Sequence, residues 1–365
     1  MTRILHFADL HLDSVFAWAG GAAIVRRENL RKTLRNIVDL AKEVESDALF
    51  CGGDLYEHDR VTPDTGEFLR ATFAALDPMP VFLAPGNHDW YGPESLYALV
   101  KWTPNVHVFR EPRFTPVSLA DGLTLWGAAH QAPANTDNFL DGFNVRGPET
   151  HVALFHGAEK SWLTQQGEGK LPHAPFDTTD IEAAGFSHAF LGHYHRPRDA
   201  ERHTYPGNPD PLEFGEDEER GPVIATIDVD GKISRERRRV AVTETHDIVL
   251  DITGCTNRQD ARDRLAAQVH EMTGFARLTV QGEWDPTMDL SASDLGDTLD
   301  CFHAVQIRFG QIHTAYDVES LAKEPTVQGQ FVRDVISDKL PPDEERRVLM
   351  TGLRALGGRV DLEVL

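Results

Sequence analysis

The sequence predicts an α/β fold, and two patterns in its first half carry that prediction. Short apolar runs recur at residues 4–8, 48–51, 81–84, 123–127, 152–155 and 189–191. Continuous short runs of this kind are typical of strands that are buried on both faces. Between the runs lie segments with a helical period. Strands and helices therefore alternate along the chain, which indicates a layered α/β domain.

The clearest helix follows the first apolar run. Its apolar residues recur at spacings of three and four, at Leu30, Leu34, Ile37, Val38, Ala41 and Val44. Arginine and glutamate occupy positions between them, so we expect one face to pack on the sheet and the other to face water.

The pattern changes after the turn signal Asp230-Gly231, which predicts a β-hairpin between the stretches 224–229 and 240–242. Strands are then predicted over 248–252, 277–281 and 305–309, with helices over 260–272 and 293–299. The remainder of the chain reads as helical. We therefore expect three parts: residues 1–244, a small α+β domain at 245–318, and a helical tail at 319–365.

Composition narrows the class of protein. With 36 basic and 58 acidic residues the net charge is −22, which excludes a wholly basic surface for gripping long duplex nucleic acid but permits a local basic cleft. Three cysteines are too few for a disulfide framework and favour a reducing cytoplasm. No apolar stretch reaches the length of about 20 residues that a membrane span needs, and the first residues do not resemble a signal peptide.

Five short polar motifs each follow a predicted strand: Asp9-Leu10-His11, Gly53-Asp54, Gly86-Asn87-His88-Asp89, His156-Gly157 and Gly192-His193-Tyr194-His195. Ligand sites of α/β sheets lie beyond the carboxyl ends of the strands, so we expect these motifs to meet. Imidazole, carboxylate and amide groups are metal ligands. Leaving His88 and its neighbour Asp89 aside, seven candidate ligands remain. That is too many for one ion with an open position, but it suits two ions that share a bridging carboxylate.

Each motif alone has a simpler explanation, because a single histidine is usually a packed core residue and Asp54 could cap a helix. Five such coincidences are far less plausible than one metal site. The histidines outside the motifs are assigned to structural roles: His6, His107, His130, His151 and His188. The acidic cluster at residues 216–219 is expected to be a solvated loop.

The motif order D-x-H, GD, GNHD, HG and GHxH resembles the calcineurin-like metallophosphoesterases over roughly residues 1–240. Within them the chain is most similar to the SbcD type of DNA repair nuclease, including YhaO-like proteins. The segments 205–209 (YPGNP) and 211–215 (PLEFG) and the small second domain carry this closer likeness. The resemblance implies a four-layer α/β/β/α sandwich with a capping domain and a helical C-terminal tail, and it suggests a homodimer.

The resemblance also assigns residue roles. It gives one metal to Asp9, His11 and His195, gives the other to Asn87, His156 and His193, and makes Asp54 the bridge. A hydroxide activated by both metals would attack phosphorus. His88 would stabilise developing charge or protonate the leaving alkoxide. Asp89 is expected either to hold the His88 ring or to cap a helix over residues 91–100. Mn²⁺ is the favoured ion, with Zn²⁺, Fe²⁺ and Mg²⁺ as alternatives.

The chain departs from its archaeal and eukaryotic relatives at one position. They carry a second histidine three residues after the GD aspartate, where this chain has Glu57, with His58 one residue later. One residue redirects a side chain by about 100° at a helix start, so His58 is not expected to substitute. This departure bears on the balance of exonuclease and endonuclease action. Candidate substrate contacts are Arg60, Arg196, Arg198, Arg202, Tyr205 and Asn208.

The leading hypothesis is a DNA nuclease acting at ends or hairpins in double-strand-break repair. A phosphodiesterase or phosphatase for small molecules is the first alternative, and a non-catalytic scaffold subunit is the second. In the tail, Thr326 is predicted to cap one amphipathic helix and Pro342 to begin another. These helices either pack on the second domain or dock on a partner, which the resemblance makes a coiled-coil ATPase of the SbcC type.

Overall fold

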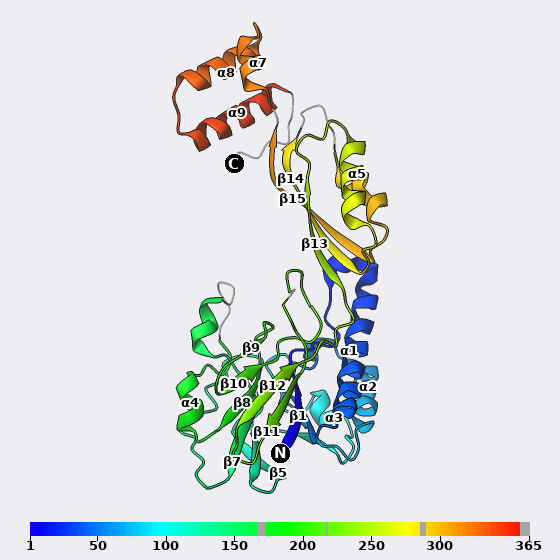
Figure 1. Ribbon diagram of the computed structural model, residues 1–365, viewed down its shortest axis with the longest axis vertical. Coiled ribbons are helices and arrows are strands. Elements are labelled where there is room, and N and C mark those ends of the chain that lie inside the picture. Colours follow the sequence, from blue (N-terminus) through cyan, green and yellow to red (C-terminus); the bar gives the residue numbers. More distant parts are fainter. Residues whose placement is uncertain (166–171, 217, 285–289, 315, 358–365) are drawn as a thin grey trace. The chain divides into compact units, whose positions relative to one another are not determined.

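The computed structural model describes residues 1–165, 172–216, 218–284, 290–314 and 316–357, and the chain forms two compact units, Met1–Thr245 and His246–Leu365 (Figure 1). The predicted α/β class is confirmed. Among the described residues, no helix is long and apolar enough to cross a lipid bilayer.

Two six-stranded sheets form the centre of the first unit. One sheet has the order β12-β11-β1-β2-β3-β4, with bounds β1 Thr2–Phe7, β2 Ala48–Cys51, β3 Val81–Leu83, β4 Val106–Val108, β11 Val223–Ile227 and β12 Ile233–Arg237. Strands β1 to β4 are parallel, and β11 pairs antiparallel with β1. The hairpin forms as predicted, but its return strand is β12 rather than residues 240–242.

The other sheet has the order β5-β6-β7-β8-β10-β9. Its strands are β5 Thr115–Ala120, β6 Leu123–Gly127, β7 Thr150–His156, β8 His188–Gly192, β9 Arg198–Asp199 and β10 His203–Tyr205. Strands β6, β7, β8 and β10 run parallel, so their carboxyl ends share one edge of the sheet.

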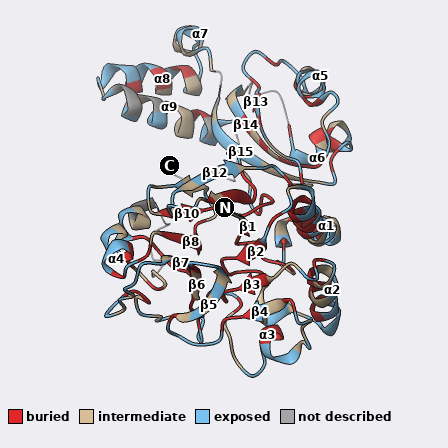
Figure 2. Ribbon diagram, turned by 60° about the horizontal axis from the view of Figure 1, so that its bottom comes forward, coloured by how far each residue is buried: buried red, intermediate tan, exposed pale blue. Residues whose placement is uncertain are grey.

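A core of buried side chains joins the two sheets. Phe50 and Phe82 from the first sheet pack with Leu154 and Phe190 from the second, and each is almost fully buried. Helices α1 Ala23–Glu43 and α2 Pro63–Ala74 lie outside the first sheet, and α4 Thr178–Ala183 lies outside the second (Figure 2). This is the expected four-layer sandwich. The remaining helices of the unit are η1 Ala17–Ala22, η2 His58–Arg60, α3 Leu96–Leu99 and η3 Lys160–Gln165.

The second unit begins with a three-stranded sheet of order β13-β14-β15. Its elements are β13 Thr245–Asp251, α5 Arg258–Val269, β14 Phe275–Trp284, α6 Ala292–Leu295, η4 Gly296–Leu299 and β15 Ala304–Thr314. Strands β14 and β15 are parallel. Leu250, Leu265 and Leu278 belong to a buried core of its own, as an independently folding α+β layer requires.

Three helices follow: α7 Val318–Lys323, α8 Val327–Ser337 and α9 Pro342–Leu356. The predicted start of α8 is confirmed, because the Thr326 side chain accepts a hydrogen bond from the Gly329 amide at 3.0 Å. Pro342 begins α9, as predicted. Val332, Val335, Leu349 and Leu353 are buried together, so these helices pack on one another. Residues 358–365 of the predicted tail lie outside the described residues.

Candidate metal centre

The five polar motifs converge at one edge of the sandwich. Asp9, Asp54 and Asn87 follow β1, β2 and β3 of the first sheet, while His156 ends β7 and His193 follows β8 of the second. Strand register brings the ends level, since Phe7 pairs with Cys51 and His156 pairs with Gly192. Each sheet thus supplies part of one ligand set.

The backbone at these motifs is strained and firmly held. Asp9, His11 and Asp54 have φ values of 54°, 51° and 51°, which is left-handed backbone that side chains with a Cβ seldom adopt. The amides of Asp9 and His11 donate to the carbonyls of Gly53 and Asp54, each at 3.0 Å, and so tie two strand-end loops together. Such strain persists where surrounding structure fixes it, which is common at functional sites.

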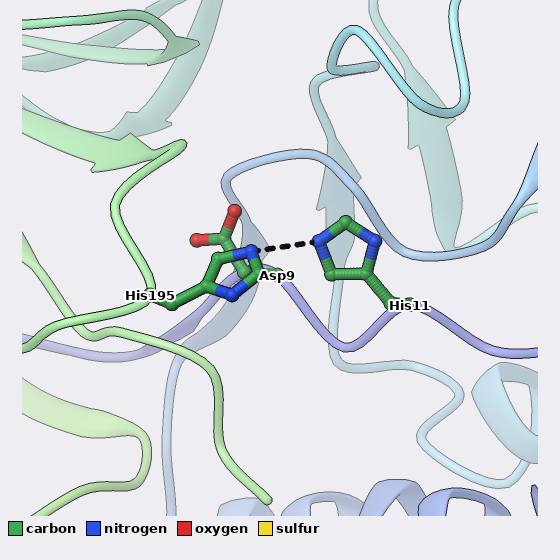
Figure 3. Close-up of side chains that lie close together, drawn as sticks. All are labelled: Asp9, His11 and His195. Carbon is green, nitrogen blue, oxygen red and sulfur yellow. Dashed lines mark hydrogen bonds between the residues drawn. The ribbon is translucent and has the colours of Figure 1, made fainter. Parts of the chain in front are cut away.

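Asp9, His11 and His195 form the first ligand group (Figure 3). Nε2 of His11 lies 3.1 Å from Nε2 of His195. Nδ1 of His11 donates to Glu57 at 2.7 Å, so in the neutral ring its Nε2 carries a lone pair. The backbone amide of His193 donates to the Asp9 carboxylate at 3.0 Å, which fixes the orientation of that side chain.

His156, Asn87 and His193 form the second group. Nδ1 of His156 donates to the Gly52 carbonyl at 2.9 Å, which leaves its Nε2 directed at the site. That nitrogen lies 3.1 Å from Oδ1 of Asn87. The His193 ring is 5.2 Å from the His156 ring, and burial holds its pKa well below the usual value. His193 is therefore neutral, as a metal ligand must be.

Asp54 lies between the two groups. Its Oδ2 is 3.7 Å from Nε2 of His11 and 3.3 Å from Nε2 of His156, while its Oδ1 accepts the His88 amide at 2.8 Å. Burial acts to raise the pKa of Asp54, but the positive potential of His156 and His11 outweighs it and holds the pKa well below the usual range. An ionised carboxylate that faces both groups could bridge two metal ions, which is the role that the resemblance implies for Asp54.

The donor set fits two divalent cations. The carboxylates of Asp9 and Asp54 are both buried, and the imidazole nitrogens of His11, His156 and His195 converge on them. Buried carboxylates and imidazole lone pairs in mutual contact are costly unless a cation or proton lies among them. The set mixes nitrogen and oxygen ligands, which Zn²⁺, Fe²⁺ and Mn²⁺ accept.

His88 borders the site and remains 46% exposed at its side chain. Its ring is 4.7 Å from the His11 ring, and its Nδ1 donates to Glu57 at 2.9 Å. Burial acts to lower the pKa of His88, but the Glu57 hydrogen bond and the Asp54 charge raise it to about 9 in the metal-free protein. His88 can therefore carry a proton to an incoming substrate.

Asp89 does not hold His88, and both roles expected for it are wrong. Its carboxylate accepts the amides of Asp54, Leu55 and Gly86 at 3.1, 2.7 and 2.6 Å, and the Tyr97 hydroxyl at 2.5 Å. These four donors occupy the hydrogen-bond acceptor positions of the Asp89 carboxylate, and the His88 ring donates to Glu57 instead. Nor does Asp89 cap a helix, because α3 begins after Ser95. Asp89 fixes the loops that present Asp54 and Asn87.

Tyr205 and Asn208 are not placed to touch substrate, contrary to expectation. Both are fully buried. The Tyr205 hydroxyl donates to the Gly157 carbonyl at 2.7 Å and thereby supports the loop after His156. Asn208 donates to Glu216 at 2.7 Å. Each supports the site through another group.

The candidate arginines are mostly engaged with acids. Arg196 pairs with Glu218 at 2.7 Å, Arg198 with Glu159 at 3.0 Å and Arg202 with Glu182 at 3.1 Å. Arg60 lies exposed in η2, on the loop that follows Asp54. Among the four, only Arg60 has no ion pair between described residues.

Three residues at the site were missed by the sequence reasoning. Glu57 was noted only as a departure, yet it contacts both His11 and His88. Glu216 was assigned to a solvated loop, but it lies 3.6 Å from Nδ1 of His195, and its side chain is 18% exposed. The half-buried His173 places its ring 5.6 Å from that of His193. His58 instead stacks on Trp90 at a ring distance of 4.0 Å.

The fold and the site together define a two-metal phosphoesterase. The chain matches the calcineurin-like phosphoesterase family over residues 2–197, more than half of its length, and it belongs to that family. Among solved structures, the protein TT1561 of Thermus thermophilus is similar at 14% identity, covering 65% of this chain and 98% of that chain, with a TM-score of 0.37.

Membership implies a metal-dependent hydrolase that binds two divalent ions. When bound, the ions supply Lewis-acid activation of the phosphoester and of the attacking water. The chain's own residues orient the ligands: Gly52 fixes His156, Glu57 fixes His11, and Asp89 holds the turn that carries Asp54. His88 stands beside this site with an exposed ring.

Proposed function

We propose that this protein is a DNA nuclease that hydrolyses phosphodiesters at ends or hairpins during double-strand-break repair. The observation that supports hydrolysis most directly is the complete donor set, from Asp9 to His195, with the exposed ring of His88 at its margin. The complete ligand set also argues against a non-catalytic scaffold subunit, because inactive relatives tend to lose ligands. The closer likeness to SbcD-type nucleases supports DNA as the substrate.

In this proposal His88 donates its proton to the leaving alkoxide as the phosphorus–oxygen bond breaks, and the bond's electron pair stays on that oxygen. Water supplies the new oxygen on phosphorus. The exposed Arg60 would meet a phosphate of the strand. We propose Mn²⁺ as the working ion, and residues 245–318 as a part that places DNA against the site.

We also propose a homodimer and a coiled-coil ATPase partner of the SbcC type. The tail helices support the second idea. Although α8 and α9 bury a shared apolar interior, Val327 remains 73% exposed and Ile336 43% exposed. Such a partner would bring the DNA-binding surface that a chain of net charge −22 does not obviously provide.

A small-molecule phosphodiester remains the second candidate substrate, and one observation favours it. Arg196, Arg198 and Arg202 are each paired with an acid, so these three side chains are less available to a nucleic-acid backbone. The test is turnover by the purified protein, across a panel of metals, of linear, hairpin and circular DNA and of an aryl phosphodiester. Cleavage of linear or hairpin DNA supports the nuclease; turnover of the aryl ester alone would favour the second candidate.

A further inference from the structure

A further imidazole, that of His173, lies beside the second ligand group although it belongs to none of the five motifs. Its ring is 5.6 Å from the ring of the ligand His193, at an angle of 66°, and 6.4 Å from the ring of His130. His130 in turn packs against the ligand His156 at a ring distance of 5.6 Å. His173 therefore stands next to the two histidines that the second metal ion would use.

The backbone holds His173 in this position. Its carbonyl accepts a hydrogen bond from the Ala158 amide at 2.9 Å. Gly157, directly after the ligand His156, permits this close approach, because a Cβ there would lie 2.9 Å from the Ala174 carbonyl oxygen. Ala174 is fully buried and has a φ of 42°, a left-handed backbone that persists only where the surroundings fix it. The segment that carries His173 is thus tied to the loop that carries a ligand.

The hydrogen-bonding capacity of the His173 ring is unused. Nδ1 is enclosed without a partner among the described residues, and no hydrogen bond between those residues involves Nε2. The side chain as a whole is only half-buried. A neutral imidazole carries one N–H, and an enclosed N–H without an acceptor is the rarer and costlier arrangement. The hydrogen of a neutral His173 ring therefore lies on Nε2, which leaves a free donor beside the second ligand group.

His173 and His88 lie on either side of the bridging carboxylate. His88 packs on the first ligand group, and His173 packs on the second. Burial and the positive potential of His156 lower the pKa of His173. The charge of Asp54 opposes that effect and His88 adds to it, so the ring lies within electrostatic reach of both. The space in front of Asp54 is thus bordered by two imidazoles that are not ligands.

We propose that His173 is a second substrate-contacting residue, and that its Nε2 donates a hydrogen bond to a non-bridging oxygen of the scissile phosphate. This inference rests on the proposed phosphodiester hydrolysis. A donor that is held in place before the reaction stabilises the negative charge that develops on the phosphoryl oxygens. His173 does this beside the second ligand group, while His88 serves the leaving oxygen beside the first.

The alternative, that His173 is a further metal ligand, agrees less well with the donor set. Asn87, His156, His193 and the bridging Asp54 already face the second ion. A metal ion that acts on a substrate keeps a coordination position open for it. An additional imidazole on the ion would occupy that position, whereas an imidazole beyond it can meet the bound substrate.

The first test measures binding by calorimetric titration, of Mn²⁺ to the metal-free protein and of inorganic phosphate to the Mn²⁺-loaded protein. His173→Leu should bind Mn²⁺ as the wild type does, but bind phosphate about 10- to 100-fold more weakly, because a hydrogen bond to a charged group is lost. His173→Gln carries an NH₂ group near the position of Nε2 and should restore phosphate binding to within about 5-fold of the wild type.

Two further variants calibrate these titrations. His193→Leu removes a proposed ligand and should lose one Mn²⁺ ion, which shows what the loss of a ligand looks like. His107→Leu changes an exposed histidine on β4 and is the matched control, which should bind both probes as the wild type does.

The second test uses oligonucleotides in which sulphur replaces either non-bridging oxygen of the scissile linkage, as separated diastereomers. Sulphur accepts hydrogen bonds weakly, so one isomer loses the contact with His173 in the wild type. The ratio of kcat/KM for the oxygen linkage to kcat/KM for that isomer should therefore fall about tenfold in His173→Leu. The ratio for the other isomer should stay unchanged.

Unchanged phosphate binding by His173→Leu would overturn the inference. Equal weakening by His173→Leu and His173→Gln, or ratios that change equally for both isomers, would show a merely structural role and overturn it too. Loss of an Mn²⁺ ion by His173→Leu would make His173 a ligand instead. If the wild-type protein cleaves no DNA, the proposed substrate fails, but the phosphate titration still decides the role of His173. The two failures are therefore distinguishable.

Discussion

Oδ1 of Asn87 lies 3.1 Å from Nε2 of His156, although the two residues come from different sheets. Nδ1 of His156 donates to the Gly52 carbonyl, so Nε2 is the nitrogen directed at the Asn87 oxygen. Burial acts to lower the pKa of His156, but the charge of Asp54 and a hydrogen bond to it raise the pKa to about 9, so in the metal-free protein a proton lies between the two atoms. The sandwich thus places a nitrogen and an oxygen ligand where its sheets meet, beside Asp54, and this arrangement underlies the first prediction.

Asp54→Ala should remove at least one of the two metal ions and nearly all hydrolysis. The substitution deletes the only carboxylate within 3.7 Å of both His11 and His156 among the described side chains. Elemental analysis after Mn²⁺ loading measures the ions per chain, and Asp59→Ala serves as the exposed control. A wild type that holds no metal after loading would contradict the assignment of the whole site.

His88→Gln should keep both ions and lower turnover by roughly 10²- to 10⁴-fold, the usual contribution of a positioned acid or base. The substitution retains the ligand Asn87. It also retains the hydrogen bond from the backbone amide of residue 88 to the Asp54 carboxylate, so the metal site should stay intact. Metal content and steady-state rates are measured on the same sample. Wild-type turnover by this variant would show that His88 has no part in the chemistry.

Asp89→Ala should destabilise the fold rather than act on chemistry alone. It leaves three buried amides and the Tyr97 hydroxyl without their acceptor, and we expect the free energy of unfolding to fall by about 3 kcal/mol or more. Tyr97→Phe removes a single donor and should cost about 1–2 kcal/mol. Urea unfolding of the metal-free proteins measures both. A stable Asp89→Ala protein would contradict the structural role.

The sequence located the site better than it located the supporting groups. The motifs Asp9 to His11 and His193 to His195 follow strands, and strand ends share an edge, so their convergence could be deduced. The residue that accepts the hydrogen bond from Nδ1 of His88 could not be deduced. Asp89 is its neighbour in the sequence, but the contact is made by Glu57, which is its neighbour in space. Contacts between loops depend on backbone turns, such as the left-handed Asp54, that no periodicity reveals.

The same limit explains the secondary structure that was missed. Strand β5 alternates between half-buried and exposed residues, so its sequence contains no apolar run from which a strand could be predicted. Helix α7 lies in the tail that was expected to be helical, but its start is set by the Asp317 cap, and a helical period cannot detect a cap. By contrast, strands buried on both faces, such as β2 and β8, were found because burial dictates composition.

His6 gives the stability of the protein a pH dependence that can be tested. Burial, with the charges of His188 and Arg237, lowers the pKa of His6 from 6.5 to about 3. In the unfolded chain His6 therefore binds a proton below pH 6.5, whereas in the folded chain it binds one only below about pH 3. The contribution of His6 to the free energy of unfolding is therefore fully present above pH 6.5 and falls as the pH falls. At pH 5 the free energy of unfolding is lower by about 2 kcal/mol.

His6→Leu should remove that part of the acid sensitivity, because leucine suits the apolar contact with Phe190 and does not titrate. Urea unfolding of metal-free wild type and variant at pH 5 and pH 8 measures the difference. If both proteins lose the same free energy between the two values, His6 is not the group responsible. His107→Leu, which concerns an exposed histidine elsewhere on the first sheet, is the control.

The tail helices should bind an ATPase of the SbcC type through apolar residues that their own packing leaves exposed. Deleting residues 317–365 removes all of α7, α8 and α9. A chain that ends at Pro325 would instead keep α7 without its partners and expose Leu321, which packs with the other two helices. We expect the longer deletion to keep its two metals and its activity on an aryl phosphodiester, and to lose binding to the purified ATPase of the same organism.

Point variants separate docking from folding of the tail. Val327→Asp and Ile336→Asp change exposed side chains and should weaken binding by about tenfold or more each, with helicity unchanged by circular dichroism. Asp338→Ala is the polar control. Gly352→Val should instead unfold the helix pair, because a Cβ at Gly352 collides with the Phe331 ring. Undiminished binding by the 317–365 deletion would show that the ATPase docks elsewhere, since no part of the α8–α9 surface would remain.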